Sequence, residues 1–299
     1  MSTITKLSPN YATAKLYYSL KNYLNDFLVY GFNLEHSREE IIVYQMGKVG
    51  SRTIVWSLKS LDLDLSIYHV HALSYEGIKR VEKVYRENFA RTRIIHNHFL
   101  QSLYLRQRLD KSKKKKKLKV VTLVREPIAR NISKFFQNLH LLMNYDLQDK
   151  INTMKTEDIV RELKQLFFEK FNSHYDFMYW FDRELKSVFE LDVFAKSFSC
   201  SEGYKTYENE QIQLLLLRVE DLNNCAQKAF KEFLDLDDFN LVTANTGNNK
   251  EYKTIYQEFL KSINLPLSYM DKIYNSRYTK HFYSEEEIKR FRKKWQKNI

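Results

Sequence analysis

Two short segments of this 299-residue sequence combine residue types that bind anions. The first is Gln45-Met-Gly-Lys-Val-Gly-Ser-Arg-Thr53, which lies between an apolar, β-branched run and a helical pattern. Free amides at a helix N-terminus point outward, and a glycine lets the backbone approach a phosphate closely. Lys48 adds a full charge, and Ser51 and Thr53 add hydroxyl groups. We interpret the segment as an anion-binding loop. The alternative is an ordinary strand-to-helix turn capped by Ser51.

The second segment is Val124-Arg-Glu-Pro-Ile-Ala-Arg-Asn-Ile-Ser133, which follows another apolar run. Arg125 ends that run, and Ser133 comes about two helical turns later, so both side chains can face one phosphate. Arg130 lies in the same predicted helix. The alternative is that Arg125 only pairs with Glu126 or another carboxylate. Two anion sites at strand ends imply a ligand that carries two separate phosphates.

These segments are positioned by an alternation of short apolar runs and helical patterns, which predicts an α/β domain of three layers. The predicted strands are 40–45, 65–70, 93–96, 118–124 and 213–219. The predicted helices are 11–30, 51–61, 74–88, 99–109, a helix from Pro127, 158–185, 223–234 and 284–297. Such alternation indicates a central parallel sheet of about five strands with helices on both faces. Ligands bind at the carboxyl ends of strands in sheets of this kind, where both anion segments lie.

The chain divides into a helical lead-in, residues 1–35, and a single domain, residues 36–299. A helical insertion is expected at about 142–190, and the C-terminal part is also helical. No internal repeat is evident, and no change of composition marks a linker.

Composition limits the function classes. Lys and Arg number 49 against 37 Asp and Glu, a net charge of +12, and five of these charges form the run 113–117, a predicted solvated loop. This balance favours anionic ligands but does not indicate nucleic acid.

Cys200 and Cys225 form no CxxC pair, so neither a thiolate zinc site nor a disulfide scaffold is expected. Without a secretory signal or a long apolar stretch, we expect a cytoplasmic protein. The basic segment 289–297 could contact a membrane surface or a partner, or form a solvated helix face.

The two anion segments resemble the nucleotide motifs of sulfotransferases. Lys48-x-Gly50-Ser51-Arg52 is similar to their 5′-phosphosulfate loop, and Arg125-x-Pro127-x-x-Arg130-x-x-Ser133 is similar to their 3′-phosphate motif. The internal proline and second arginine are closest to the carbohydrate sulfotransferases. Leu216-Leu-Arg-Val-Glu-Asp-Leu222 is similar to a late strand of many of these enzymes. The middle and C-terminal parts, including residues 274–283, resemble bacterial proteins assigned to capsular polysaccharide synthesis. The resemblance runs from about Glu40 to the C-terminus, with only the nucleotide motifs specific.

The resemblance implies a P-loop-like fold and transfer of a sulfuryl group from 3′-phosphoadenosine 5′-phosphosulfate (PAPS). The acceptor is a hydroxyl or amine of a carbohydrate, such as a capsular or surface polysaccharide precursor, and no metal is required. Lys48 neutralises the bridging oxygen as the nucleotide leaves. The cytosolic sulfotransferases place an adenine-stacking tryptophan where this chain has Thr53. The residues expected to bind the donor are Lys48, Val49, Gly50, Ser51, Arg52, Thr53, Arg125, Ser133 and, in a late basic loop, Lys250.

The acceptor requires a base, and His98 resembles the strand-end histidine of the small-molecule sulfotransferases. Carbohydrate enzymes often use a carboxylate instead, and a structural histidine is also compatible with the sequence. His69-Val-His71 and His96-Asn-His98 could together form a transition-metal site, which suggests a metal-dependent hydrolase as an alternative. A further alternative is a non-catalytic nucleotide- or glycan-binding subunit of a polysaccharide assembly complex.

Overall fold

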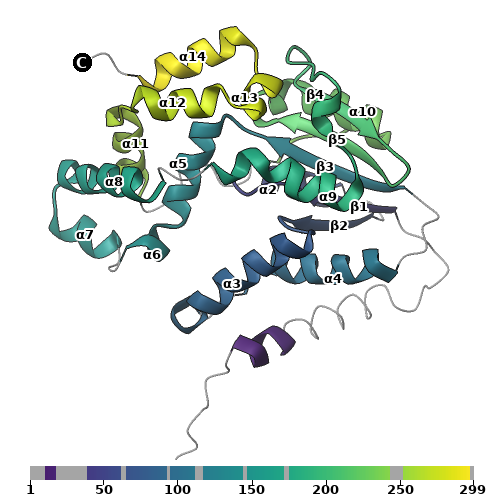
Figure 1. Ribbon diagram of the computed structural model, residues 1–299, viewed down its shortest axis with the longest axis horizontal. Helices are drawn as coiled ribbons and strands as arrows, with labels where there is room; N and C mark the ends of the chain where they lie inside the picture. The colour runs from purple at the N-terminus through teal and green to yellow at the C-terminus, as the bar shows by residue number, and fades with distance from the viewer. Residues whose placement is uncertain are drawn as a thin grey trace, which may run out of the picture.

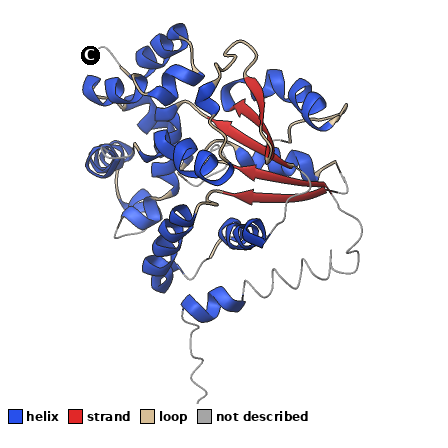
Figure 2. Cartoon of the chain, turned by 45° about the vertical axis from the view of Figure 1, so that its right-hand side comes forward, coloured by secondary structure: helices blue, strands red, loops and turns tan. Residues whose placement is uncertain are grey.

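A five-stranded sheet forms the centre of the computed structural model, which describes residues 11–17, 39–61, 65–92, 95–111, 117–143, 147–171, 175–242 and 252–296. The strand order is β2-β1-β3-β5-β4. Four strands are parallel: β1 (Glu39–Tyr44), β2 (Leu65–Val70), β3 (Leu118–Val124) and β5 (Ile212–Arg218). β4 (Tyr204–Glu208) pairs antiparallel with β5 at the edge of the sheet. Helices enclose the sheet, which confirms the three-layer α/β class (Figure 2).

The strands expected at 65–70 and 118–124 have the predicted bounds, and those at 40–45 and 213–219 are each shifted by one residue. The prediction of a strand at 93–96 is wrong for residues 95 and 96, which are the two that the structure describes. Ile95 and His96 are not in a strand, and α4 begins at Asn97. The fifth strand is β4 instead. This strand has only five residues, and most of them are polar, as an edge strand allows. The pattern of apolar residues therefore did not indicate it. An Asn209 side chain that accepts from the backbone N–H groups of Gln211 and Ile212 forms the turn to β5.

The helices follow the predicted pattern closely around the sheet. The long predicted helix 158–185 is instead two parts, α8 and then a run of shorter helical segments. The described helices are α2 (Ser51–Lys59), α3 (Tyr75–Thr92), α4 (Asn97–Lys111), α5 (Pro127–Gln137), α6 (Leu139–Leu142), α7 (Leu147–Thr153), α8 (Thr156–Phe171), η1 (Asp176–Tyr179), η2 (Phe181–Lys186), α9 (Ser187–Phe189), η3 (Val193–Ala195), η4 (Val219–Asp221), α10 (Leu222–Leu234), α11 (Lys253–Ser262), α12 (Leu267–Tyr274), α13 (Arg277–Phe282) and α14 (Glu285–Trp295). Residues 11–17 are also helical.

Two main apolar cores stabilise the structure. The larger core lies on the sheet and includes β1, β3 and β5 with residues of η2 and α10. The second core joins α5 to α8, α11 and α12, with Phe135 in contact with Phe167 and Phe259. Figure 1 shows α8 and α11 side by side, away from the sheet. Because α5 contributes to the second core and begins at the end of β3, it connects the helical part to the carboxyl edge of the sheet.

A buried glutamate joins the helical insertion to the ends of the first two strands. Glu184, in η2, accepts hydrogen bonds from the Tyr44 hydroxyl at 2.6 Å and the Leu73 and Ser74 backbone N–H groups at 2.8 and 2.9 Å. A Cβ at Gly77 would lie 1.8 Å from Glu184 Oε1, so a larger residue there would displace the carboxylate. Glu184 therefore fixes the strand ends beside the predicted anion-binding loop.

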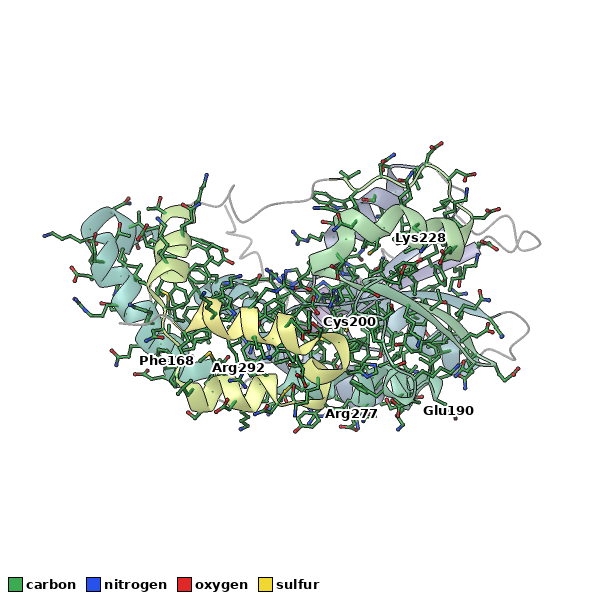
Figure 3. All side chains as sticks on the ribbon, turned by 90° about the horizontal axis from the view of Figure 1, so that it is seen from above. Phe168, Glu190, Cys200, Lys228, Arg277 and Arg292 are labelled. Atoms are coloured by element: carbon green, nitrogen blue, oxygen red, sulfur yellow. The ribbon has the colours of Figure 1, made fainter. Side chains whose placement is uncertain are left out.

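The C-terminal helices dock on the same edge of the sheet. Arg218, the last residue of β5, is buried and donates to the Phe282 and Cys200 carbonyl oxygens and to Glu287. Arg292 of α14 forms an ion pair with Asp271 of α12, and Figure 3 labels Arg292 beside the C-terminal helices.

Several sequence predictions fall on residues outside the described ranges: the lysine run except Lys117, Lys250, and most of the lead-in 1–35. Among the described residues, no helix is both long and apolar enough to cross a membrane.

Candidate functional site

The loop after β1 has a backbone conformation that calls for an explanation. Lys48 has φ 75° and Gly50 has φ 76°, both in the left-handed region. The other described non-glycine residues with positive φ, Glu190 and Asp235, are helix C-caps, where this conformation is common. Lys48 has no such role, and strained residues of this kind cluster at ligand-binding sites. Gly50 is the N-cap of α2 and makes no side-chain cap hydrogen bond, which leaves the first amides of α2 without one.

Two arginines from the second segment contact this loop directly. Arg125 Nη1 donates to the Lys48 carbonyl oxygen at 3.1 Å, and Arg130 Nε donates to the Gly47 carbonyl oxygen at 3.1 Å. Because β1 and β3 are neighbouring parallel strands, the loop and the arginines meet at one edge of the sheet. No carboxylate oxygen of the described residues lies within 4.0 Å of a guanidinium nitrogen of either arginine. Within this part of the chain, their charges are therefore not neutralised by an ion pair. The structure thus brings the two predicted anion segments together.

Glu126 does not pair with Arg125, as the sequence alternative suggested. Its buried carboxylate is the N-cap of α5, where it accepts from the backbone N–H groups of Ile128 at 2.9 Å and Ala129 at 2.7 Å. The first amides of α5 are therefore occupied by the protein itself. An anion beside β3 has to be held by side chains, and Arg125 is partly exposed there.

The remaining predicted donor-binding residues lie in the same loop, at the start of α2 and on α5, with one exception. Val49 is buried, Arg52 is exposed at the start of α2, and Thr53 is half-buried with its N–H bonded to the Gly50 carbonyl at 3.1 Å. Ser133 is half-buried on α5, two turns from Arg125. Lys250 lies outside the described residues.

Ser51 does not cap its helix. Its side chain is buried, and its hydroxyl lies 2.9 Å from His69 Nε2. Gln45 Nε2 lies 3.2 Å from the same nitrogen and 3.1 Å from His71 Nδ1. The loop is therefore linked by hydrogen bonds to the end of β2.

Four imidazoles gather beside the loop. Ring centroids lie 4.9 Å apart for His69 and His71, 4.6 Å for His71 and His98, and 5.2 Å for His96 and His98. His98 is on the first turn of α4 rather than at a strand end. The described residues contain no group of three or more His, Cys, Asp or Glu side chains arranged to hold a metal ion. The two histidine pairs therefore lie close together, as the metal-dependent hydrolase alternative requires. The described histidines are not arranged to bind a metal ion, so the structure does not support that alternative.

Burial and mutual proximity keep these imidazoles neutral. Burial, followed by the neighbouring His71, lowers the pKa of His69 to about 3. Burial, followed by the charges of His71 and His96, lowers the pKa of His98 to about 2. The pKa of His71 is lowered to about 4 by burial and by Arg130 and Lys48, although a hydrogen bond to the Gln45 carbonyl opposes the shift. A general base works best with a pKa near the operating pH, so a bound polyanion that raises these pKa values would improve the base.

The structure adds residues to the site that the sequence reasoning missed. The Tyr278 hydroxyl accepts from the Arg125 N–H at 3.2 Å and donates to the Arg125 carbonyl at 3.1 Å. Lys134, on α5, has its pKa lowered to about 8 by burial and then by Arg130. Tyr278 lies in the segment 274–283 that resembles polysaccharide synthesis proteins, but its role there depends on a tertiary contact that no spacing shows.

The comparison with protein families gives a match to part of the chain. The family model described as "NKWYS: Putative capsular polysaccharide synthesis protein" matches residues 146–284, slightly less than half of the chain. No curated protein and no solved structure matches the chain. The matched segment contains Arg218, Glu220 and Tyr278, but not the loop after β1 or Arg125.

Proposed function

We propose that this protein is a sulfotransferase that moves a sulfuryl group from PAPS to a carbohydrate acceptor in the synthesis of a surface polysaccharide. The observation that carries the proposal is the contact of Arg125 and Arg130 with the carbonyl oxygens of Lys48 and Gly47, each at 3.1 Å. Two anion-binding segments that are far apart in the sequence thereby form one site, which suits a ligand with a phosphate on each side of a ribose. The resemblance of both segments to sulfotransferase motifs supports this ligand.

In the proposed reaction, the loop after β1 holds the 5′-phosphate through the backbone amides at the start of α2, which have no side-chain cap, and the hydroxyl of Ser51. Arg125 and Ser133 hold the 3′-phosphate through side-chain hydrogen bonds. The acceptor oxygen attacks sulfur, the bond from sulfur to the bridging oxygen breaks, and its electron pair stays on the nucleotide phosphate. Lys48 neutralises that charge, and His98 accepts the hydroxyl proton. Such transfers depend mainly on positioning and charge stabilisation.

The carbohydrate acceptor is supported by the family match. The family description names capsular polysaccharide synthesis, and the matched residues 146–284 include η1 and η2. Arg130 lies over the Phe177 ring at 5.2 Å, and Trp180 Nε1 donates to the His71 carbonyl at 3.1 Å. The matched segment thus borders the site where an acceptor must enter.

Calorimetric titration with adenosine 3′,5′-bisphosphate tests the proposal. We expect binding by the wild-type protein, much weaker binding of ATP and AMP, and a loss for Arg125→Ala. Hydrogen bonds to a charged group contribute about 1.5–3 kcal/mol, and tenfold in affinity is about 1.4 kcal/mol, so the loss should be about 10- to 150-fold. Arg290→Ala is a matched control, because Arg290 is exposed on α14 and only borders Glu287 at 4.0 Å.

A folded wild-type protein that does not bind the bisphosphate contradicts the proposal. Binding of the bisphosphate without sulfuryl transfer to any of a panel of polysaccharides would favour the alternative of a non-catalytic binding subunit. Transfer abolished by Lys48→Ala would support catalysis.

A further inference from the structure

Tyr85 connects the two histidines of the pair His96-Asn-His98. It lies on α3, and its hydroxyl is 3.3 Å from His98 Nε2 and 2.9 Å from His96 Nδ1. His98 is half-buried next to the loop, whereas His96 is exposed to solvent. The three polar groups therefore form a chain that begins beside the candidate site and ends at the surface.

We propose that Tyr85 and His96 carry the acceptor's proton from His98 to solvent, an inference that rests on the proposed function. Sulfuryl transfer to a hydroxyl releases one proton, and this proton cannot remain on the base if the enzyme is to turn over. Since His98 Nε2 is bonded to Tyr85, its Nδ1 is the nitrogen available to the acceptor hydroxyl.

Protons and charges balance over one transfer. Before transfer, His98 carries its proton on Nε2 and donates it to the Tyr85 oxygen, while the Tyr85 hydroxyl donates to His96 Nδ1. The acceptor proton then binds His98 Nδ1. The Nε2 proton moves to the Tyr85 oxygen, and the phenolic proton moves to His96 Nδ1. His96 becomes an imidazolium and releases its Nε2 proton to water, so His98 and Tyr85 end neutral. Both imidazoles then carry their proton on Nδ1, and proton exchange with water after the product has left restores the starting tautomers.

The surroundings suit this role. Burial raises the pKa of Tyr85 to about 12, so the phenol keeps its proton and can relay rather than ionise. The Tyr85 ring packs against Phe99 with centroids 5.0 Å apart, which holds the hydroxyl between the two imidazoles. The charged or titratable groups that act on His98 are His71, His96, His69 and Arg52, and each disfavours a lasting positive charge on it. A protonated His98 is therefore less stable than a protonated histidine without these neighbours, and a route that removes its proton is needed.

Nitrogen NMR of the histidine rings tests the direction of the chain. We expect the wild-type protein to hold His98 as the Nε2–H tautomer and His96 with an unprotonated Nδ1. Tyr85→Phe should abolish both preferences, and adenosine 3′,5′-bisphosphate should still bind to this variant. A His98 that carries its proton on Nδ1 instead would overturn the relay, because Tyr85 would then donate inward.

Turnover of labelled PAPS on a polysaccharide panel provides the second readout. Tyr85→Phe should lower kcat about tenfold with little change in KM, since general acid–base groups contribute about 10²–10⁴-fold and the base itself remains. Added imidazole buffer should restore the rate, which a purely structural defect would not allow. Tyr104→Phe on α4 is the control. Unchanged kcat in Tyr85→Phe, or a loss that imidazole does not restore, overturns the relay alone. No bisphosphate binding by wild type overturns the proposed function as well.

Discussion

Replacing Glu126 with glutamine should destabilise the protein strongly, although the two side chains have the same shape. Glu126 Oε1 accepts from the Ile128 N–H at 2.9 Å and the Tyr274 hydroxyl at 2.8 Å. Its Oε2 accepts from the Ala129 N–H at 2.7 Å and Trp295 Nε1 at 3.3 Å. The carboxylate is buried, so water cannot replace a lost acceptor.

A glutamine amide has one acceptor oxygen, and it satisfies these donors best in a single orientation. With its oxygen at the Oε2 position, it keeps Ala129 and Trp295, and the Tyr274 hydroxyl can rotate to accept from the new NH₂. The Ile128 N–H is left without an acceptor, which costs about 1–3 kcal/mol. Loss of the negative charge at the N-terminus of α5 adds about 0.3–1 kcal/mol. We therefore expect Glu126→Gln to lower the free energy of unfolding by roughly 1–4 kcal/mol.

Urea unfolding followed by tryptophan fluorescence measures this loss. Glu285→Gln is the matched control, because Glu285 is exposed in the first turn of α14 and should cost at most about 1 kcal/mol. Glu126→Ala removes both acceptor oxygens and should cost more than Glu126→Gln. A loss below about 0.5 kcal/mol for Glu126→Gln, comparable with an ordinary surface substitution, would refute this account of the cap.

Two further predictions concern the histidines and Tyr278. The pKa values of His69 and His71, about 3 and about 4 in the folded protein, lie below the ordinary value of 6.5. The unfolded chain thus binds more protons below about pH 6.5, so stability should fall as the pH is lowered from about 6.5 to about 3. The urea midpoint measures this, and His71→Asn should flatten the dependence; a midpoint independent of pH would contradict the neutral imidazoles. Tyr278→Phe leaves the Arg125 N–H and carbonyl without their shared partner, which should cost about 1–3 kcal/mol of stability and weaken adenosine 3′,5′-bisphosphate binding, measured by calorimetry against Tyr104→Phe.

The sequence predicts the parallel part of the sheet because these strands are buried on both faces and therefore read as continuous apolar runs. β3, Leu118–Val124, is apolar apart from Lys119 and Thr122 and has the predicted bounds. β4 escapes prediction for the opposite reason, since an edge strand such as Tyr204–Glu208 can keep polar residues. Residues 95–96 show that a short apolar run does not by itself identify a strand, because Ile95 is buried without being in one.

The sequence predicts that the two proposed anion segments lie together, because each segment directly follows a buried strand and the carboxyl ends of parallel strands lie at one edge. What the residues of these segments bind within the protein cannot be read from spacing. Ser51 can cap a helix, bind phosphate or contact a histidine, and only the fold places His69 within 2.9 Å of it. The same holds for Glu126, whose partners Tyr274 and Trp295 come from the C-terminal helices.

Contacts from the C-terminal part of the chain connect the segment matched by the family model to the candidate site. Arg125 is held from two sides: its side chain by the loop after β1, through Lys48, and its backbone by Tyr278 of α13. Glu220, at the end of β5, also accepts from the Glu126 N–H at 2.8 Å and from the Tyr283 hydroxyl at 3.0 Å. The matched segment, residues 146–284, thus supplies the groups that fix the backbone of the second anion segment without containing that segment. Substitutions in α13 should therefore affect donor binding even though no residue of α13 is expected to touch the donor.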